Sequence, residues 1–349
     1  MLAATAPVQR PSDAKLLVVD ALGHLRHVPR RDFVTLLHSG DLVVANDAAT
    51  LPASLTGRHL PTGDAIEVRL AGRTSLSADD VHVFSAIVFG AGDFRTPTEH
   101  RPAPPPLRRG DRLSLGPLRA TVTETLGHPR LVSLHFDGSS DEIWAGVARH
   151  GRPIQYAHLA TPVSLWDVWT AIAGPPVAFE PPSAGFVLDW QSLDAMRARG
   201  VEFATITHAA GISSTGDADL DQRLPFDEPY DIPSATAHAI ARALAEGRRI
   251  VAIGTTVVRA LEHAATGRRS VKAGPGVATQ RITDATHLQI VDAIVSGVHE
   301  PATSHFQLLG AFADRRTLEE ADAAMSAGGY RTHEFGDSVW LDRRLHAAV

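Results

Sequence analysis

A short stretch in the last third of the chain joins a buried-strand pattern, a glycine and a helix pattern. Residues 250–253 form an apolar run rich in β-branched side chains, as expected of a strand buried on both faces. Gly254 interrupts this run, and Thr255 and Thr256 offer hydroxyls at the N-cap position of a following helix. Backbone N–H groups and the helix dipole at such a junction favour a polar or anionic ligand. The stretch therefore predicts either a ligand site or an ordinary strand-to-helix turn.

Two regions of α/β pattern flank a β-rich middle. In the first and last parts of the chain, short apolar runs alternate with segments of helical periodicity. Between them, short runs of alternating apolar and polar residues are separated by turn signals. We therefore predict an α/β main domain made of residues 1–57 and 151–349, with an inserted small β-barrel domain at residues 58–150.

Composition excludes several classes of function. The chain of 349 residues contains no cysteine, which rules out disulfides and thiol nucleophiles. Its 18 histidines are scattered without a His-Glu-x-x-His motif, so we expect no metal site. The net charge of −6 is unlike that of most nucleic-acid binders, although a local arginine patch could still hold phosphates. Without a long apolar run or an export pattern, we expect a cytoplasmic protein with no membrane partner.

Four pieces of sequence occur in the order found in one enzyme family. They are Asn46-Asp47 with Leu51-Pro52-Ala53; Gly254-Thr255-Thr256-x-x-Arg259-x-Leu261-Glu262; Val291-Asp292-Ala293 running to His299-Glu300-Pro301; and Tyr330-Arg331 with Phe335-Gly336-Asp337. With these pieces the chain resembles the S-adenosylmethionine:tRNA ribosyltransferase-isomerase family, which acts in queuosine biosynthesis. The resemblance runs nearly end to end, and it implies the same α/β domain with an inserted barrel.

The resemblance also implies a reaction. The family transfers the ribosyl unit of S-adenosylmethionine (SAM), its co-substrate, to the aminomethyl group of a 7-aminomethyl-7-deazaguanine base in tRNA. The ribose is isomerised to an epoxycyclopentanediol, the epoxyqueuosine-forming step, and adenine and methionine leave. Because the sulfonium acidifies the adjacent ribose carbon, one base is needed, and because adenine leaves best when protonated, one acid helps.

We assign candidate roles to the polar residues of these pieces. His299, Asp337 and Glu228 are the candidates for catalysis, since a histidine titrates near neutrality and a carboxylate can hold a hydroxyl or a sulfonium. The candidates for SAM binding are Asn46, Asp47, Gly254, Thr255, Thr256 and Arg259. The alternatives are structural: a histidine at a strand end, aspartates in ordinary turns, and an exposed helix arginine.

Departures from the family pattern leave the acceptor open. Ala49 and Ser54 stand where the family has arginines, and Val187 stands where it has a histidine. Because loss of an arginine from a phosphate or carboxylate contact is a large change, we predict a retained SAM pocket with an altered acceptor site. Two other functions remain open: a SAM-consuming enzyme that acts on a small molecule or eliminates adenine, and a SAM-binding protein without catalysis.

Overall fold

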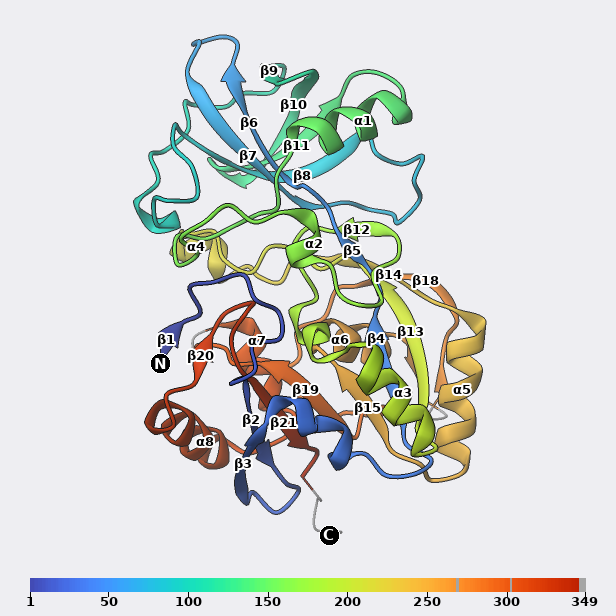
Figure 1. Cartoon of the computed structure of the whole chain (residues 1–349). Helices are drawn as coiled ribbons and strands as arrows, with labels where there is room; N and C mark the ends of the chain where they lie inside the picture. The colour runs from blue at the N-terminus through green and yellow to red at the C-terminus, as the bar shows by residue number, and fades with distance from the viewer. Residues whose placement is uncertain (268–269, 302, 345–349) are drawn as a thin grey trace.

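The computed structural model describes residues 1–267, 270–301 and 303–344, and it has two parts that differ in architecture (Figure 1). A β-barrel occupies one end, and a larger sheet covered by helices occupies the other. The N-terminus and the last described strand, β21 (Ser338–Asp342), both lie in the larger part (Figure 1). No helix among the described residues is both long and apolar enough to cross a membrane.

The larger part is built on a mixed sheet of nine described strands. In sheet order they are β18 (Gly274–Ala278), β14 (Glu228–Ile232), β13 (Glu202–His208), β4 (Leu42–Asn46), β15 (Ile250–Ile253), β19 (Ala293–Gly297), β21 (Ser338–Asp342), β2 (Lys15–Val19) and β3 (Leu25–Pro29). The four strands from β13 to β19 are parallel, and Leu42 of β4 lies in register with Glu202 and Ile250. The carboxyl ends of these strands therefore meet at one edge of the sheet.

Helices cover both faces of this sheet. One face packs against α5 (Ser234–Ala245), α6 (Thr255–Ala264), α7 (Ser304–Leu309) and α8 (Arg315–Ala327), and the other against η1 (Arg30–Leu36), η3 (Ser183–Val187) and α3 (Trp190–Ala198). Along β4, Leu42 and Val44 point to the first face, while Val43 and Ala45 point to the second. Since neither face meets water, the central strands can be apolar throughout, as their sequences predicted.

The smaller part is a closed antiparallel barrel. Its strands are β6 (Ser54–His59), β7 (Ala65–Gly72), β8 (Val83–Phe89), β9 (Arg112–Leu115), β10 (Leu118–His128) and β11 (Leu131–Phe136), in the order β10-β11-β8-β7-β6-β9. Helix α1 (Ser140–His150) follows, started by a capping box of Ser139 and Glu142. The predicted fold class, an α/β domain with a small β-barrel inserted, is confirmed. The division at residues 57/58 and 150/151 stays a prediction; β6 begins at Ser54.

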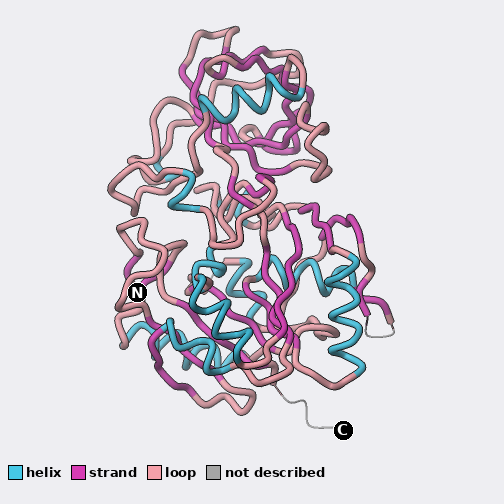
Figure 2. Tube along the Cα trace, turned by 45° about the vertical axis from the view of Figure 1, so that its right-hand side comes forward, coloured by secondary structure: helices cyan, strands magenta, loops and turns pink. Residues whose placement is uncertain are grey.

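The two parts are joined by loops and short elements that lie between the barrel and the large sheet (Figures 1 and 2). The barrel core takes in apolar side chains from this connecting region, among them Phe179, Ile212 and Leu220. The remaining short elements are β1 (Leu2–Ala3), β5 (Ala49–Thr50), η2 (Thr98–His100), α2 (Leu165–Val168), β12 (Pro176–Ala178), α4 (Ala218–Asp221), β16 (Ala265–Thr266), β17 (Ser270–Val271) and β20 (Arg331–Thr332).

Candidate active site

A cavity opens at the carboxyl edge of the parallel strands, where β15 gives way to α6 and β19 ends. Six of the nine predicted site residues line it: Glu228, Gly254, Thr255, Thr256, Arg259 and His299. They come from β14, from the start of α6 and from the segment after β19, and the sheet brings them together. This is the position at which open α/β sheets bind their ligands.

Gly254 sets the geometry at the start of α6. Its backbone lies at φ 101° and ψ 154°, a region essentially limited to glycine, and its N–H donates to the Val295 carbonyl at 2.8 Å. Gly254 is itself the N-cap residue, and no side chain caps the helix, so the prediction that Thr255 and Thr256 occupy the N-cap position is wrong. They are the first two helical residues. The first N–H groups of α6 therefore have no intrahelical acceptor and lie beside the cavity.

Glu228 and Arg259 form a buried ion pair in the cavity wall. Arg259 donates to Glu228 Oε2 through Nη1, and its Nη2 donates to the Ala278 carbonyl at 2.9 Å. The other Glu228 oxygen accepts from the Gly211 N–H at 2.6 Å. Burial raises the pKa of Glu228, and the Arg259 charge and the Gly211 N–H offset part of that rise. Because both oxygens are engaged, the pair is better suited to hold the wall together than to transfer protons.

Asn46 and His208 lie directly behind this wall. The Asn46 side chain exchanges two hydrogen bonds with the His208 backbone, both at 2.9 Å, and its Nδ2 is 3.4 Å from Thr256 Oγ1. His208 is fully buried, with Nε2 3.5 Å from Glu228 Oε2. Burial lowers the pKa of His208 to about 3, so its ring is neutral at physiological pH. Asn46 therefore fixes the end of β13 and contacts the site through Thr256.

His299 is accompanied by a second histidine that the sequence did not suggest. The rings of His299 and His305 stack with centroids 4.7 Å apart, and both side chains line the cavity. Desolvation lowers the pKa of His299 well below its ordinary value, helped by His305 and His333. Desolvation and Arg259 lower the pKa of His305 to about 4. Both imidazoles are thus neutral near pH 7, with an unprotonated ring nitrogen, although burial makes each a weaker base than a free histidine.

Glu180 is the cavity residue whose titration lies nearest to neutral pH. It is 6% exposed and accepts from the Tyr156 hydroxyl and from the Ser213 N–H at 3.1 Å. Burial, with a smaller contribution from the Glu334 charge, raises the pKa of Glu180 to about 7. A carboxyl group that exchanges its proton near neutral pH is suited to general acid–base catalysis.

Asp47 and Asp337 lie outside this cavity. Asp47 accepts a hydrogen bond from Thr207 Oγ1 at 2.7 Å, at the end of β13. Asp337 is 1% exposed, and its two oxygens accept from the Lys15 and Arg331 N–H groups, each at 2.7 Å. The geometry therefore does not support the predicted catalytic role of Asp337. Its carboxylate ties the start of β2 to the turn before β21.

Comparison with known proteins identifies the family. The family model described as "Queuosine biosynthesis protein" matches residues 1–341. The chain is 34% identical to the S-adenosylmethionine:tRNA ribosyltransferase-isomerase of Sorangium cellulosum, covering 97% of this chain and 95% of the relative. The Thermus thermophilus enzyme of the same name is 31% identical, covering 94% and 92%.

The chain belongs to the queuosine biosynthesis protein family. Its fold is similar to the crystal structure of the S-adenosylmethionine tRNA ribosyltransferase from Thermotoga maritima. The TM-score is 0.51 at 22% identity, and the match covers 97% of this chain and 96% of the other. The family resemblance drawn from the sequence motifs is confirmed.

Arg69 lies beside Ser54, one of the two positions where the family has an arginine and this chain does not. Ser54 of β6 is paired with Arg69 of β7, and both side chains donate to Glu67 Oε1, at 2.8 and 2.7 Å. The Arg69 guanidinium is buried over the Phe89 ring, and its Nη1 and Nη2 make no hydrogen bond within the described part of the chain. Ala49 is buried beside β12, where Pro176 is its partner.

Three lining residues of this queuosine biosynthesis family member escaped the sequence analysis. Glu180 precedes the Pro181-Pro182 pair, His305 lies in α7, and exposed Arg281 donates to the Gln222 carbonyl at the cavity. A charged residue just before a proline pair was a weak signal for Glu180. His305 and Arg281 carried no signal, because only the fold places them beside Gly254 and His299.

Proposed function

We propose that this protein catalyses SAM-dependent ribosyl transfer and isomerisation on tRNA, with a 7-aminomethyl-7-deazaguanine base as the acceptor. SAM is the co-substrate that supplies the ribosyl unit. Support comes from the family match over residues 1–341 together with relatives named for this activity at about a third identity. The observation that carries the proposal is that the family motifs around Gly254 and His299 meet in one cavity.

The start of α6 is the proposed site for the amino acid part of SAM. The free N–H groups beside Thr255 and Thr256 suit a carboxylate, and the helix dipole adds to this preference. Arg281 is the lining cation that is not engaged with a buried carboxylate, so it is placed to pair with the same group. Arg259 acts indirectly, because its charge is held by Glu228.

The proton transfers are proposed for the opposite side of the cavity. Neutral His299, stacked on His305, is the candidate base for the ribose carbon next to the sulfonium. Glu180, with a pKa of about 7, is protonated in part at neutral pH and is the candidate acid for the departing adenine. Both residues line the same cavity, which also lets either one accept the proton released by the attacking amine.

The decisive experiment incubates the protein with SAM and tRNA that carries the aminomethyl-deazaguanine base. Digestion and mass spectrometry should detect the epoxyqueuosine nucleoside, with adenine and methionine released in equal amounts. His299→Ala should lower the rate by at least about a hundredfold, the scale expected for loss of a general base. Adenine released without modified tRNA would contradict the proposed acceptor, and absence of both products under conditions where the Thermus enzyme works would contradict the function.

A further inference from the structure

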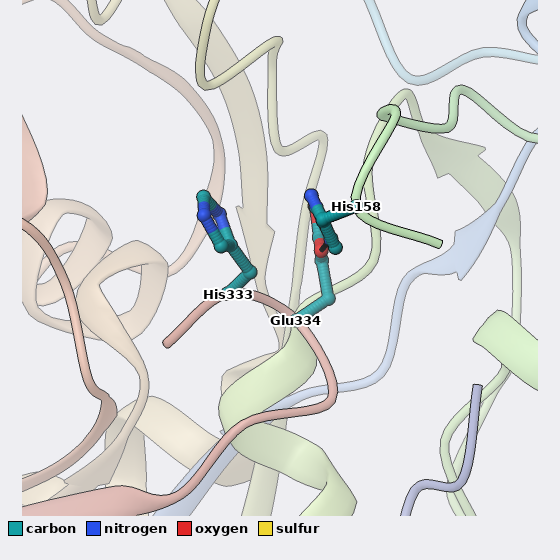
Figure 3. A group of neighbouring side chains, drawn as sticks. All are labelled: His158, His333 and Glu334. Atoms are coloured by element: carbon teal, nitrogen blue, oxygen red, sulfur yellow. Dashed lines mark hydrogen bonds and ion pairs between the residues drawn. The ribbon is translucent and has the colours of Figure 1, made fainter. Parts of the chain in front are cut away.

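We propose that His158, His333 and Glu334 form a binding site for a divalent transition-metal ion. Their ligand atoms all lie within 4.8 Å of one another, although His158 is 175 residues before His333 in sequence. Figure 3 shows the two imidazole rings facing each other, with the Glu334 carboxylate close to His158. The scattered histidines gave no sign of such a group, because the fold alone brings these two segments together.

One distance within the cluster already fits coordination of one ion. His158 Nε2 is 3.2 Å from Glu334 Oε2. Two ligands held by bonds of about 2.0–2.1 Å at tetrahedral angles lie roughly 3.3 Å apart, so this pair already has the spacing. The rings of His158 and His333 are stacked at 4.3 Å, so the His333 ring must turn to direct its lone pair at the same ion. Its side chain is 37% exposed, which leaves room for that rotation.

The surrounding cavity favours a cation for an independent reason. The cavity beside the cluster is lined by the carboxyl groups of Glu180, Asp221, Glu300 and Glu334, and no lysine or arginine is among its described lining residues. Such a concentration of carboxyl groups without a cation lowers the energy of a bound positive ion. Glu300 Oε1 is 3.9 Å from His333 Nε2, so it can approach the same ion or orient its ligands.

The backbone at His333 also indicates a constrained site. His333 has φ 69°, and it is the non-glycine residue with positive φ among those described. The left-handed conformation is uncommon outside glycine, and residues held there occur often at ligand sites. The turn it occupies is fixed immediately afterwards by Asp337, whose carboxylate accepts from the Arg331 N–H at 2.7 Å. The polypeptide therefore holds His333 and Glu334 against the cavity.

The donor set defines the class of ion. Two imidazoles and one carboxylate suit Zn²⁺ and other first-row divalent ions, whereas Mg²⁺ and Ca²⁺ prefer oxygen ligands throughout. Three protein ligands leave at least one coordination position for water or a substrate oxygen. His299 and His305 line the same cavity as His333 and Glu334, so that open position would lie in the space next to the candidate active site. The inference stands on this geometry and does not require the proposed reaction.

The test measures metal binding directly, without SAM or tRNA. Untagged, metal-stripped protein is dialysed against Zn²⁺ and assayed for bound metal, and Co²⁺ loading is followed by its visible absorption, which reports histidine coordination. We expect one equivalent bound, and at least a tenfold weaker affinity in His158→Ala and Glu334→Gln, since loss of even an outer partner costs this much. The thermal unfolding midpoint of each metal-free variant, compared with wild type, establishes that the fold is intact.

His82→Ala is the matched control. His82 belongs to another pair of neighbouring histidines, with its ring tilted against that of His135 and the centroids 5.9 Å apart, at the barrel. That variant should bind metal as the wild type does. Less than one equivalent in the wild type, or equal affinity in the wild type, His158→Ala and Glu334→Gln, would overturn the proposal.

Discussion

Glu180 shows how one buried residue couples stability to pH. The ordinary pKa of a glutamate is 4.5, and burial, which disfavours the charged form, raises that of Glu180 to about 7 in the folded protein. Between these values the native state keeps a proton that the unfolded state releases. The Glu180 contribution to the free energy of unfolding is therefore fully present below about pH 4.5, is lost as pH rises to about 7, and amounts to something on the order of 3 kcal/mol.

Glu180→Gln should abolish this contribution. Because glutamine does not titrate, the free energy of unfolding of the variant relative to the wild type should rise between about pH 5 and pH 8. Urea denaturation at several pH values in this range measures the difference. In the variant the Ser213 N–H can donate to the amide oxygen, and the amide NH2 can donate to the Tyr156 hydroxyl oxygen, so the fold should persist. Parallel pH profiles in the two proteins would show that Glu180 is charged in the native state.

Asp337 belongs to a family motif, which suggested a catalytic role. Its hydrogen bonds to backbone N–H groups indicate that it stabilises the fold instead. Asp337→Asn removes one of the two carboxylate oxygens that accept from the Lys15 and Arg331 N–H groups. A buried donor left without an acceptor costs about 1–3 kcal/mol. We expect that loss in urea denaturation, with the KM for SAM unchanged. A large fall in kcat with wild-type stability would instead restore the catalytic assignment.

At the scale of elements, the junction of β15 and α6 depends on one glycine. Gly254→Ala places a Cβ on a backbone at φ 101°, 3.3 Å from the Ala184 side chain. The strain should cost about 1–3 kcal/mol of stability. If the backbone shifts to relieve that strain, the first N–H groups of α6 no longer point at the proposed SAM carboxylate. The KM for SAM should then rise about tenfold or more. Steady-state kinetics and urea denaturation measure the two effects.

Gly247→Ala is the control for this substitution. Gly247 has φ 67° after α5, and no heavy atom lies within 4 Å of a Cβ added there. Alanine at this position should lose a similar amount of stability with no change in the KM for SAM. If both variants raise the KM for SAM equally, the rise is caused by general destabilisation and not by a shift of the α6 N-terminus.

The junction was predictable from sequence because its strand is buried on both faces, which leaves an uninterrupted apolar run at residues 250–253. The segment at residues 226–233 has no strand pattern in its sequence, yet it contains β14. This strand carries Glu228, Pro229 and Asp231, residues that disfavour strands in isolation, and its backbone is held by pairing with β13 and β18. Pairing between distant segments leaves no local signal in the sequence.

The same limit applies to the candidate site. His299, Gly254 and Thr255 were found because family motifs mark them, and the cavity includes all three. Glu180 and His305 come from segments without a motif and reach the cavity through folding of the connecting region and α7. The catalytic role of Asp337 stays a prediction, because a retained residue type does not say whether its partner is a substrate or the backbone.

At the scale of the whole molecule, the barrel and the α/β part share packing. Phe179 is 1% exposed and belongs to the barrel core, where its ring meets Phe84 edge-on with centroids 6.2 Å apart. The next residue in the chain is Glu180, in the wall of the cavity. The position of a candidate catalytic residue therefore depends on packing against the barrel.

Phe179→Ala tests this dependence. Loss of a buried phenylalanine should cost about 3–5 kcal/mol of stability, measured by urea denaturation. It should also displace Glu180, so kcat should fall and the pH at half-maximal kcat should shift from that of the wild type. Phe136→Ala is the matched control, because the Phe136 ring also packs against Phe84, with centroids 5.8 Å apart. This variant should lose comparable stability with little change in the pH profile of kcat. Identical pH profiles for wild type and both variants would mean that the barrel stabilises the protein without positioning the cavity.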